Sequence, residues 1–181
     1  MTQNIKYLFL SFLFIAISCQ QRPQKKEENI KPKLDEISTY YFIRHAEKDT
    51  SDTGNRNPAL TEIGKERAEN WKNVFKNVDF DAVYSSDFIR TIETGKPTAE
   101  SKGLKVQIYD HTKLNSDAFK KATKGKKVLV VGHTNTTPYF ANAVFGEEIF
   151  KNDIDESQHG KLFIVQVNPN GENRIENLTI N

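Results

Sequence analysis

The chain has 181 residues, a length typical of a single domain, and its charge is balanced, with 26 Lys and Arg against 24 Asp and Glu. A formal net charge of +2 excludes a dedicated nucleic-acid binder, which would show a strong basic excess or a basic stripe. Hydrophobic residues make up 36% of the chain, enough to build a core, so disorder of the whole chain is excluded. A single cysteine excludes an intramolecular disulfide and a cysteine-based metal cluster.

The N-terminal segment resembles a bacterial lipoprotein signal peptide. Lys6 provides a positive start, and the apolar run over residues 7–17 is too short for a membrane-spanning helix, which needs ~20 residues. Small residues then precede Cys19, as in the lipobox of bacterial lipoproteins. We therefore predict a signal peptide over residues 1–18, with diacylglyceryl transfer to the Cys19 thiol. The alternative is a buried N-terminal helix with an incidental cysteine.

A flexible tether is predicted over residues 19–36, because this segment is polar and charged and contains Pro23 and Pro32. The globular domain is predicted over residues 37–181. Lipidation would hold this domain in the cell envelope, on the periplasmic face or the cell surface. Contact with the membrane is then expected through lipidated Cys19 only.

Strand and helix patterns alternate along the predicted domain. Apolar and β-branched runs predict strands, and N-cap residues followed by helical periodicity predict helices between them. The predicted strands are residues 39–43, 82–84, 106–109 and 128–131. One predicted helix begins after Thr61, and a second begins after residues 85–87 and breaks or restarts at Pro97. Two further helices are predicted over residues 116–123 and 136–146. Two further strands, 162–167 and 174–180, are predicted to pair antiparallel. This order predicts an α/β fold, a three-layer α/β/α sandwich with a mostly parallel sheet.

Residues that can bind phosphate follow the predicted strands directly. Arg44 and His45 follow the first strand, Arg90 lies one helical turn beyond the second, and His133 follows the fourth. Because ligands bind outside the carboxyl ends of the strands in open α/β sheets, we expect these four side chains to meet at one edge. Guanidinium groups match phosphoryl oxygens, a neutral imidazole can attack phosphorus, and a protonated imidazole can stabilise the developing charge. The sequence therefore indicates a phosphate pocket.

The alternative for each single residue is a structural role. A lone histidine after a strand is more often a hydrogen-bonded polar residue than a catalytic one, so the hypothesis depends on the convergence of two arginines and two histidines. His111 and His159 lack comparable partners, and we interpret both as ordinary surface residues. The four histidines show no metal-ligand spacing, and the sequence contains no phosphate-binding P-loop or dinucleotide fingerprint.

Four segments together resemble the motifs of the histidine phosphatase (phosphoglycerate mutase-like) superfamily. They occur in family order and are residues 42–48 (FIRHAEK), 57–64 (NPALTEIG), 84–94 (YSSDFIRTIET) and 130–135 (VVGHTN). The resemblance implies a phosphoglycerate mutase-like fold without metal or cofactor. It also implies that His45 is the nucleophile and that Arg44, Arg90 and His133 complete the phosphate pocket, with Thr134 as a further substrate-binding residue.

The general acid is the point at which this chain departs from the family pattern. Many members carry a carboxylate between the second Arg and the second His, often within a long insertion, whereas only 42 residues separate Arg90 from His133. Asp110 directly follows a predicted strand and is our candidate acid, with loop capping as its structural alternative. Glu93 is a second candidate. A missing acid would favour good leaving groups, such as phosphohistidine and phosphoanhydrides.

The sequence thus predicts a metal-independent phosphomonoester hydrolase that acts through a phosphohistidine intermediate. We expect a monomer whose partner is a small phosphorylated substrate or an envelope glycan phosphate, and no nucleic acid. One alternative is a non-catalytic phosphate- or glycan-binding lipoprotein, which a poor general acid would favour. The other is a phosphohistidine protein phosphatase of the compact type.

Overall fold

The computed structural model describes residues 36–180. The predicted signal peptide over residues 1–18 and all but the last residue of the predicted tether over residues 19–36 lie outside this range. Within it, the chain forms no helix that is both long enough and apolar enough to cross a membrane.

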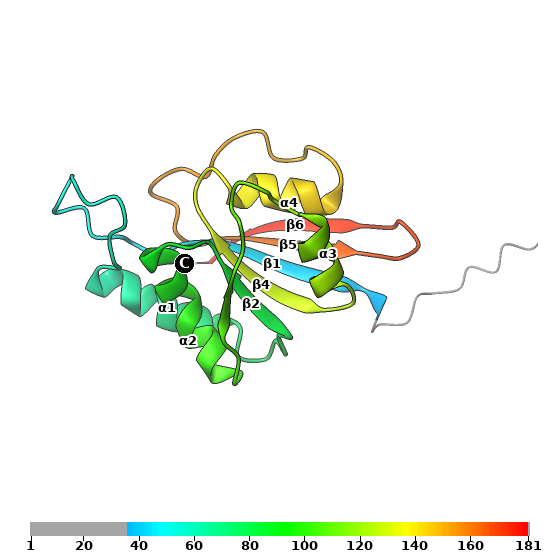
Figure 1. Cartoon of the computed structure of the whole chain (residues 1–181), viewed down its shortest axis with the longest axis horizontal. Helices are drawn as coiled ribbons and strands as arrows, with labels where there is room; N and C mark the ends of the chain where they lie inside the picture. Colours follow the sequence, from blue (N-terminus) through cyan, green and yellow to red (C-terminus); the bar gives the residue numbers. More distant parts are fainter. Residues whose placement is uncertain (1–35, 181) are drawn as a thin grey trace, which may run out of the picture. The chain divides into compact units, whose positions relative to one another are not determined.

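A six-stranded sheet forms the middle layer of the domain, with the strand order β3-β2-β4-β1-β5-β6 (Figure 1). The strands are β1 (Ser38–Arg44), β2 (Ala82–Ser85), β3 (Val106–Ile108), β4 (Lys127–Gly132), β5 (Lys161–Val167) and β6 (Arg174–Thr179). The first four run parallel, whereas β5 pairs antiparallel with both β1 and β6. The mostly parallel sheet and the antiparallel final pair are as the sequence predicts.

Helices cover both faces of the sheet, as the lower and upper layers in Figure 1 show. They are α1 (Glu62–Val74), α2 (Ile89–Ser101), α3 (Asp117–Thr123) and α4 (Thr137–Phe145). In β1, Phe42 belongs to the apolar cluster that contains residues of α3 and α4, whereas the next residue, Ile43, belongs to the cluster that contains residues of α1 and α2. Because successive strand residues point to opposite faces, a strand covered on both sides must be apolar throughout. The predicted three-layer α/β/α sandwich is confirmed.

The start of α1 is fixed directly on the segment that follows β1. Thr61 caps the helix, and its Oγ1 accepts a hydrogen bond of 3.0 Å from the Gly64 backbone N–H. The Thr61 backbone N–H in turn donates to the carbonyl oxygen of Glu47 at 2.9 Å. Gly64 packs against the same carbonyl so closely that an added Cβ would lie 2.2 Å from the oxygen. Only glycine fits there, which explains the glycine three residues after the cap.

The second helix differs from the sequence prediction at two points. It begins after Phe88, whose side chain makes no capping hydrogen bond, although Ser85 to Asp87 supply better capping residues. It also runs through Pro97 without a break. A proline inside a helix removes one backbone hydrogen bond, and here burial of the neighbouring Gly95 and Thr98 against the sheet keeps the segment helical.

Replacement of Gly64 by alanine tests the contact between α1 and the β1 loop. The new methyl group would meet a backbone carbonyl, which cannot rotate away, so the helix or the loop must shift. We expect Gly64→Ala to lower the free energy of unfolding by about 1–3 kcal/mol, as overpacking does in cores, measured by denaturant titration. Lys65→Ala on the exposed side of the same turn is the control and should change stability by less than about 0.5 kcal/mol. A neutral Gly64→Ala would contradict the contact.

Candidate active site

The predicted site residues are brought together by the pairing of β1, β4 and β2. Arg44 stands opposite Gly132 in the parallel β1–β4 register, and the His45 backbone N–H donates to the Gly132 carbonyl at 3.0 Å. His133 therefore follows β4 next to the point where His45 follows β1, and their ring centroids lie 5.5 Å apart. Arg90, in the first turn of α2, places Nη2 3.4 Å from Nδ1 of His133.

His45 is buried and held in one orientation. Its Nδ1 lies 2.7 Å from the carbonyl oxygen of Ala46, so Nδ1–H is the donor and Nε2 carries the free lone pair. Burial above all, and then the positive charges of Arg44 and Arg90, lower the pKa of His45 to about 3. The imidazole is therefore neutral at pH 7, which is the form that can act as a nucleophile.

His133 is oriented by a chain of hydroxyl groups on its other side. Its Nε2 lies 2.8 Å from Ser86 Oγ, which lies 3.0 Å from Thr91 Oγ1, and Thr91 donates to backbone carbonyls. These partners favour donation by Nε2–H and leave Nδ1 toward Arg90. Burial first, and then the charge of Arg90, lower the pKa of His133 to about 4, so it too is neutral in the free protein at pH 7.

Arg90 and the loop after His45 are linked through one buried hydroxyl. Thr94 Oγ1 donates to the Arg90 carbonyl at 2.7 Å and accepts from the Ala46 backbone N–H at 2.9 Å. The guanidinium of Arg90 lies over the Phe88 ring, with Cζ 4.4 Å from the ring centroid. Within residues 36–180, its buried Nε and Nη1 have no hydrogen-bond partner, so these donors remain available to an anion.

Arg44 is paired with a residue that the sequence analysis did not identify. The Arg44 side chain is almost fully buried, and its Nη2 lies 2.5 Å from Oε2 of Glu156, whose side chain is 72% exposed. Nη1 donates to the backbone carbonyls of Glu156 at 2.7 Å and Asp155 at 3.2 Å. Thr134 donates to the other Glu156 oxygen at 3.3 Å. Glu156 lies between α4 and β5, where no periodic pattern marks it.

A cavity of about 360 Å³ opens over these side chains. It is lined by His45, Lys48, Phe88, Arg90, His111, His133, Thr134, Asn135, Thr136, Asp153 and Glu156. Arg44 does not line this cavity, but it contacts Glu156, which does. Four of the predicted site residues, His45, Arg90, His133 and Thr134, thus share one cavity.

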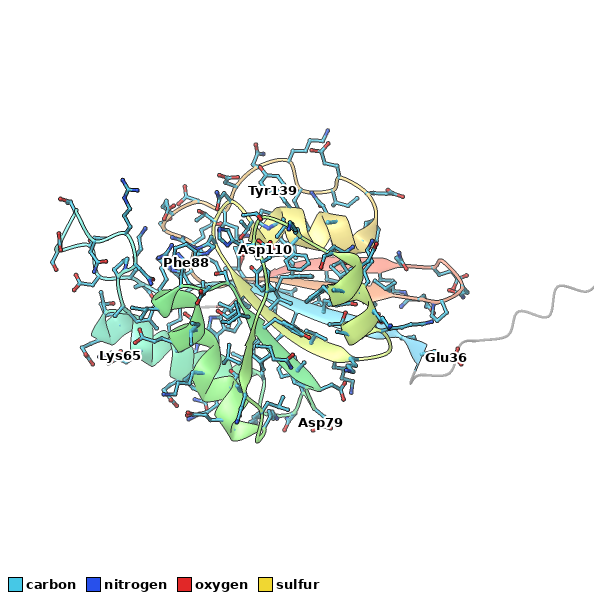
Figure 2. All side chains as sticks on the ribbon, viewed as in Figure 1. Glu36, Lys65, Asp79, Phe88, Asp110 and Tyr139 are labelled. Atoms are coloured by element: carbon cyan, nitrogen blue, oxygen red, sulfur yellow. The ribbon has the colours of Figure 1, made fainter. Side chains whose placement is uncertain are left out.

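Asp110, the candidate acid, does not line this cavity, whereas Phe88 does. Figure 2 labels both side chains. The exposed carboxylate of Asp110 accepts from the backbone N–H and the hydroxyl of Thr112 at 2.9 and 2.6 Å, and these hydrogen bonds lower its pKa. It lines a separate cavity between β3 and α3. Glu93 is occupied as well, because its Oε2 accepts from the Leu60 backbone N–H at 2.8 Å. Both carboxylates have structural partners.

The interpretation of His111 and His159 as ordinary surface residues is wrong. His111 lines the cavity, with its ring centroid 6.1 Å from that of His133. His159 is half-buried, and its Nδ1 donates to the backbone carbonyl of His45 at 3.1 Å. All four histidines of the chain therefore gather at one site. Contacts that join residues far apart in the chain carry no local sequence signal.

The arrangement suits the binding and transfer of a phosphoryl group. A neutral imidazole with a free lone pair lies beside a second imidazole and an arginine with unused donors, and guanidinium groups match phosphoryl oxygens. In the part of the chain that the structure describes, no three His, Cys, Asp or Glu side chains are arranged to hold a metal ion.

Residues 40–115 match the sequence model of the histidine phosphatase superfamily (branch 1), and this stretch includes Arg44, His45 and Arg90. Over this stretch the chain is similar to that superfamily. No curated protein matches the sequence.

Solved structures share the fold of this domain. The protein histidine phosphatase SixA complexed with tungstate is 16% identical, with a TM-score of 0.58 over 78% of this chain and 96% of that chain. A mycobacterial glucosyl-3-phosphoglycerate phosphatase is 13% identical, with a TM-score of 0.57 over 80% of this chain and all of that chain. At these identities the likeness concerns the fold.

The lowered histidine pKa values predict how stability depends on pH. Between the unfolded pKa of ~6.5 and the folded values of about 3 and 4, the unfolded chain binds more protons, so stability falls as pH falls below ~6.5. Each histidine contributes at most roughly 1.4 kcal/mol per pH unit. We expect the unfolding free energy to decline from pH 7 to pH 5 in denaturant titrations, and His45→Asn with His133→Asn to flatten that decline. An unchanged slope in the double variant would rule out these pKa shifts.

Proposed function

We propose that this protein is a metal-independent phosphomonoester hydrolase that acts through a phosphohistidine on His45. The observation that carries the proposal is the 2.7 Å hydrogen bond from His45 Nδ1–H to the Ala46 carbonyl. It fixes the tautomer in which Nε2 bears the lone pair, inside a cavity that also contains Arg90 and His133. The tungstate in the SixA structure is a tetrahedral oxyanion, as phosphate is, which supports the same chemistry here.

The reaction divides into two displacements at phosphorus. The Nε2 lone pair of His45 attacks phosphorus, the P–O bond to the leaving group breaks, and that oxygen takes a proton from solvent as it departs. A water molecule then attacks phosphorus and gives a proton back to solvent, the electron pair of the P–N bond returns to Nε2, and inorganic phosphate leaves. Positive charge for the transferring phosphoryl group comes from Arg44 and Arg90. His133 adds to it, because it becomes protonated once the dianion is bound. No step calls for a metal ion.

A compact phosphohistidine protein phosphatase is the second candidate, and the position of Asp110 favours it. With the Asp110 carboxylate held by Thr112 outside the cavity, the enzyme suits leaving groups that need little help from an acid. An imidazole leaving from phosphorus is such a group. Similarity in fold to the protein histidine phosphatase SixA supports this candidate.

The nucleophile is tested by replacing His45. We expect His45→Ala to lower the turnover of 4-nitrophenyl phosphate by at least ~10³-fold and to prevent the trapping of acid-labile, base-stable phosphate that the wild type should show. Asp110→Asn is the matched comparison and should keep at least about half of wild-type turnover. Undiminished turnover by His45→Ala would overturn the mechanism. A wild type that binds phosphate without turning over any ester would be the non-catalytic binding protein instead.

Lipid anchoring in the cell envelope is part of the proposal. Its support is the short apolar segment that ends at Cys19, the only cysteine, followed by a polar segment. An anchored enzyme would meet phosphorylated envelope glycans, which makes these a candidate substrate.

Cys19→Ser tests the anchor. We expect the wild type to take up labelled fatty acid and to sediment with membranes, and Cys19→Ser to remain an unprocessed precursor without label. Mass spectrometry of the wild type checks the modified residue. A soluble wild-type protein with residue 19 unmodified is the result that rules the anchor out.

A further inference from the structure

A second cavity adjoins the first on the side of the loop between β1 and α1. It has a volume of about 400 Å³ and includes Lys48, Arg56, Pro58 and Arg90 in its wall. Lys48 and Arg90 also line the cavity that contains His45. The two cavities therefore share two side chains of their walls, whereas His45 lines only the first cavity and Arg56 only the second.

The loop that forms this second cavity is held at both ends. Lys48 and Leu60 form an antiparallel bridge, and the Asp49 backbone N–H donates to the Ala59 carbonyl at 2.9 Å. Farther out, Asn57 Oδ1 accepts from the Ile89 backbone N–H at 2.9 Å. The last contact ties the loop to the start of α2, next to Arg90. The cavity wall is thus joined to the element that positions the catalytic arginine.

The charges on this wall favour an anion. Three cations line the cavity, Lys48, Arg56 and Arg90, and none of them forms a salt bridge within residues 36–180. Two carboxylates, Asp49 and Asp52, lie in the same loop. Each uses Oδ1 to accept a backbone N–H of its own loop, from Ser51 and from Gly54, at 2.9 Å. The carboxylates therefore shape the loop, while the cations remain without a partner carboxylate.

We propose that this second cavity binds a second anionic group of the substrate, a carboxylate or phosphate carried by the leaving group. The inference rests on the proposed phosphomonoester hydrolase activity and adds the class of substrate. Arg56 is the specificity-determining residue, because it lines only the second cavity, whereas Lys48 and Arg90 serve both. A guanidinium at this place can bind either anion with two hydrogen bonds.

The test compares esters that differ only in the second anion. Phenyl phosphate is compared with 3- and 4-carboxyphenyl phosphate, whose leaving groups differ little in reactivity. We expect the wild type to prefer one carboxylated ester by at least about tenfold in kcat/KM. Arg56→Gln should reduce that ratio to about one, and Arg56→Lys should retain part of it. Arg174→Gln on β6 is the charge-matched control and should leave the ratio unchanged. Equal use of all three esters, or a preference that survives Arg56→Gln, overturns the proposal.

Binding of non-hydrolysable phosphonates separates this inference from the proposed activity. Phenylphosphonate and its 3- and 4-carboxy derivatives are titrated calorimetrically into the full chain and into Arg56→Gln. If no ester is turned over but a carboxyphosphonate binds at least about tenfold more tightly through Arg56, the hydrolase proposal falls and the anion subsite stands. If esters are turned over without any carboxylate preference, the subsite falls and the hydrolase stands. Without turnover and without a binding preference, both fall.

Discussion

The parallel pairing of β1 with β4 is the constraint on which the site depends. It sets Arg44 opposite Gly132, and the His45 backbone N–H donates to the Gly132 carbonyl. His45 and His133 therefore follow the ends of β1 and β4 at neighbouring positions. Both strands are buried on both faces, and a slip of one residue would exchange the side chains that pack against α1 and α2 with those that pack against α3 and α4. The geometry of the two imidazoles is therefore stabilised by the whole apolar core, at a distance from the chemistry.

Burial first, and then positive charge, keep His45 and His133 neutral at this edge. Arg44, Arg90 and Lys48 surround imidazoles that are already desolvated, and each effect opposes a further proton. The neutral form that nucleophilic attack needs is thus the resting form, without a neighbouring base to create it. In the proposed reaction, a bound phosphate dianion would change this balance, because it would place negative charge beside His133. The same positive charges would then keep His45 neutral before binding and stabilise the phosphoryl group after it.

The sequence predicts those features of the fold and site that arise locally. Strands, helix caps and the residues that directly follow β1 and β4 can be identified from alternation and from chain position, because both strands are central. The same rule misplaces Asp110, since β3 is the edge strand of the sheet and ends two residues before Asp110, and an irregular segment and a turn follow it. His111 lines the cavity in place of Asp110. Glu156 could not be predicted, because its contact with Arg44 spans 112 residues and begins in an irregular segment.

The ion pair between Arg44 and Glu156 has a consequence for affinity. A buried guanidinium without a counter-ion would be costly, and Glu156 supplies one while the cavity holds no substrate. In the proposed reaction, a phosphate that reaches Arg44 would therefore exchange one anion for another, and its affinity for Arg44 would reflect only the difference between the two. The mostly exposed Glu156 side chain would return as inorganic phosphate departs. A competing carboxylate of this kind would weaken the binding of substrate and product alike, and would so limit inhibition by the product.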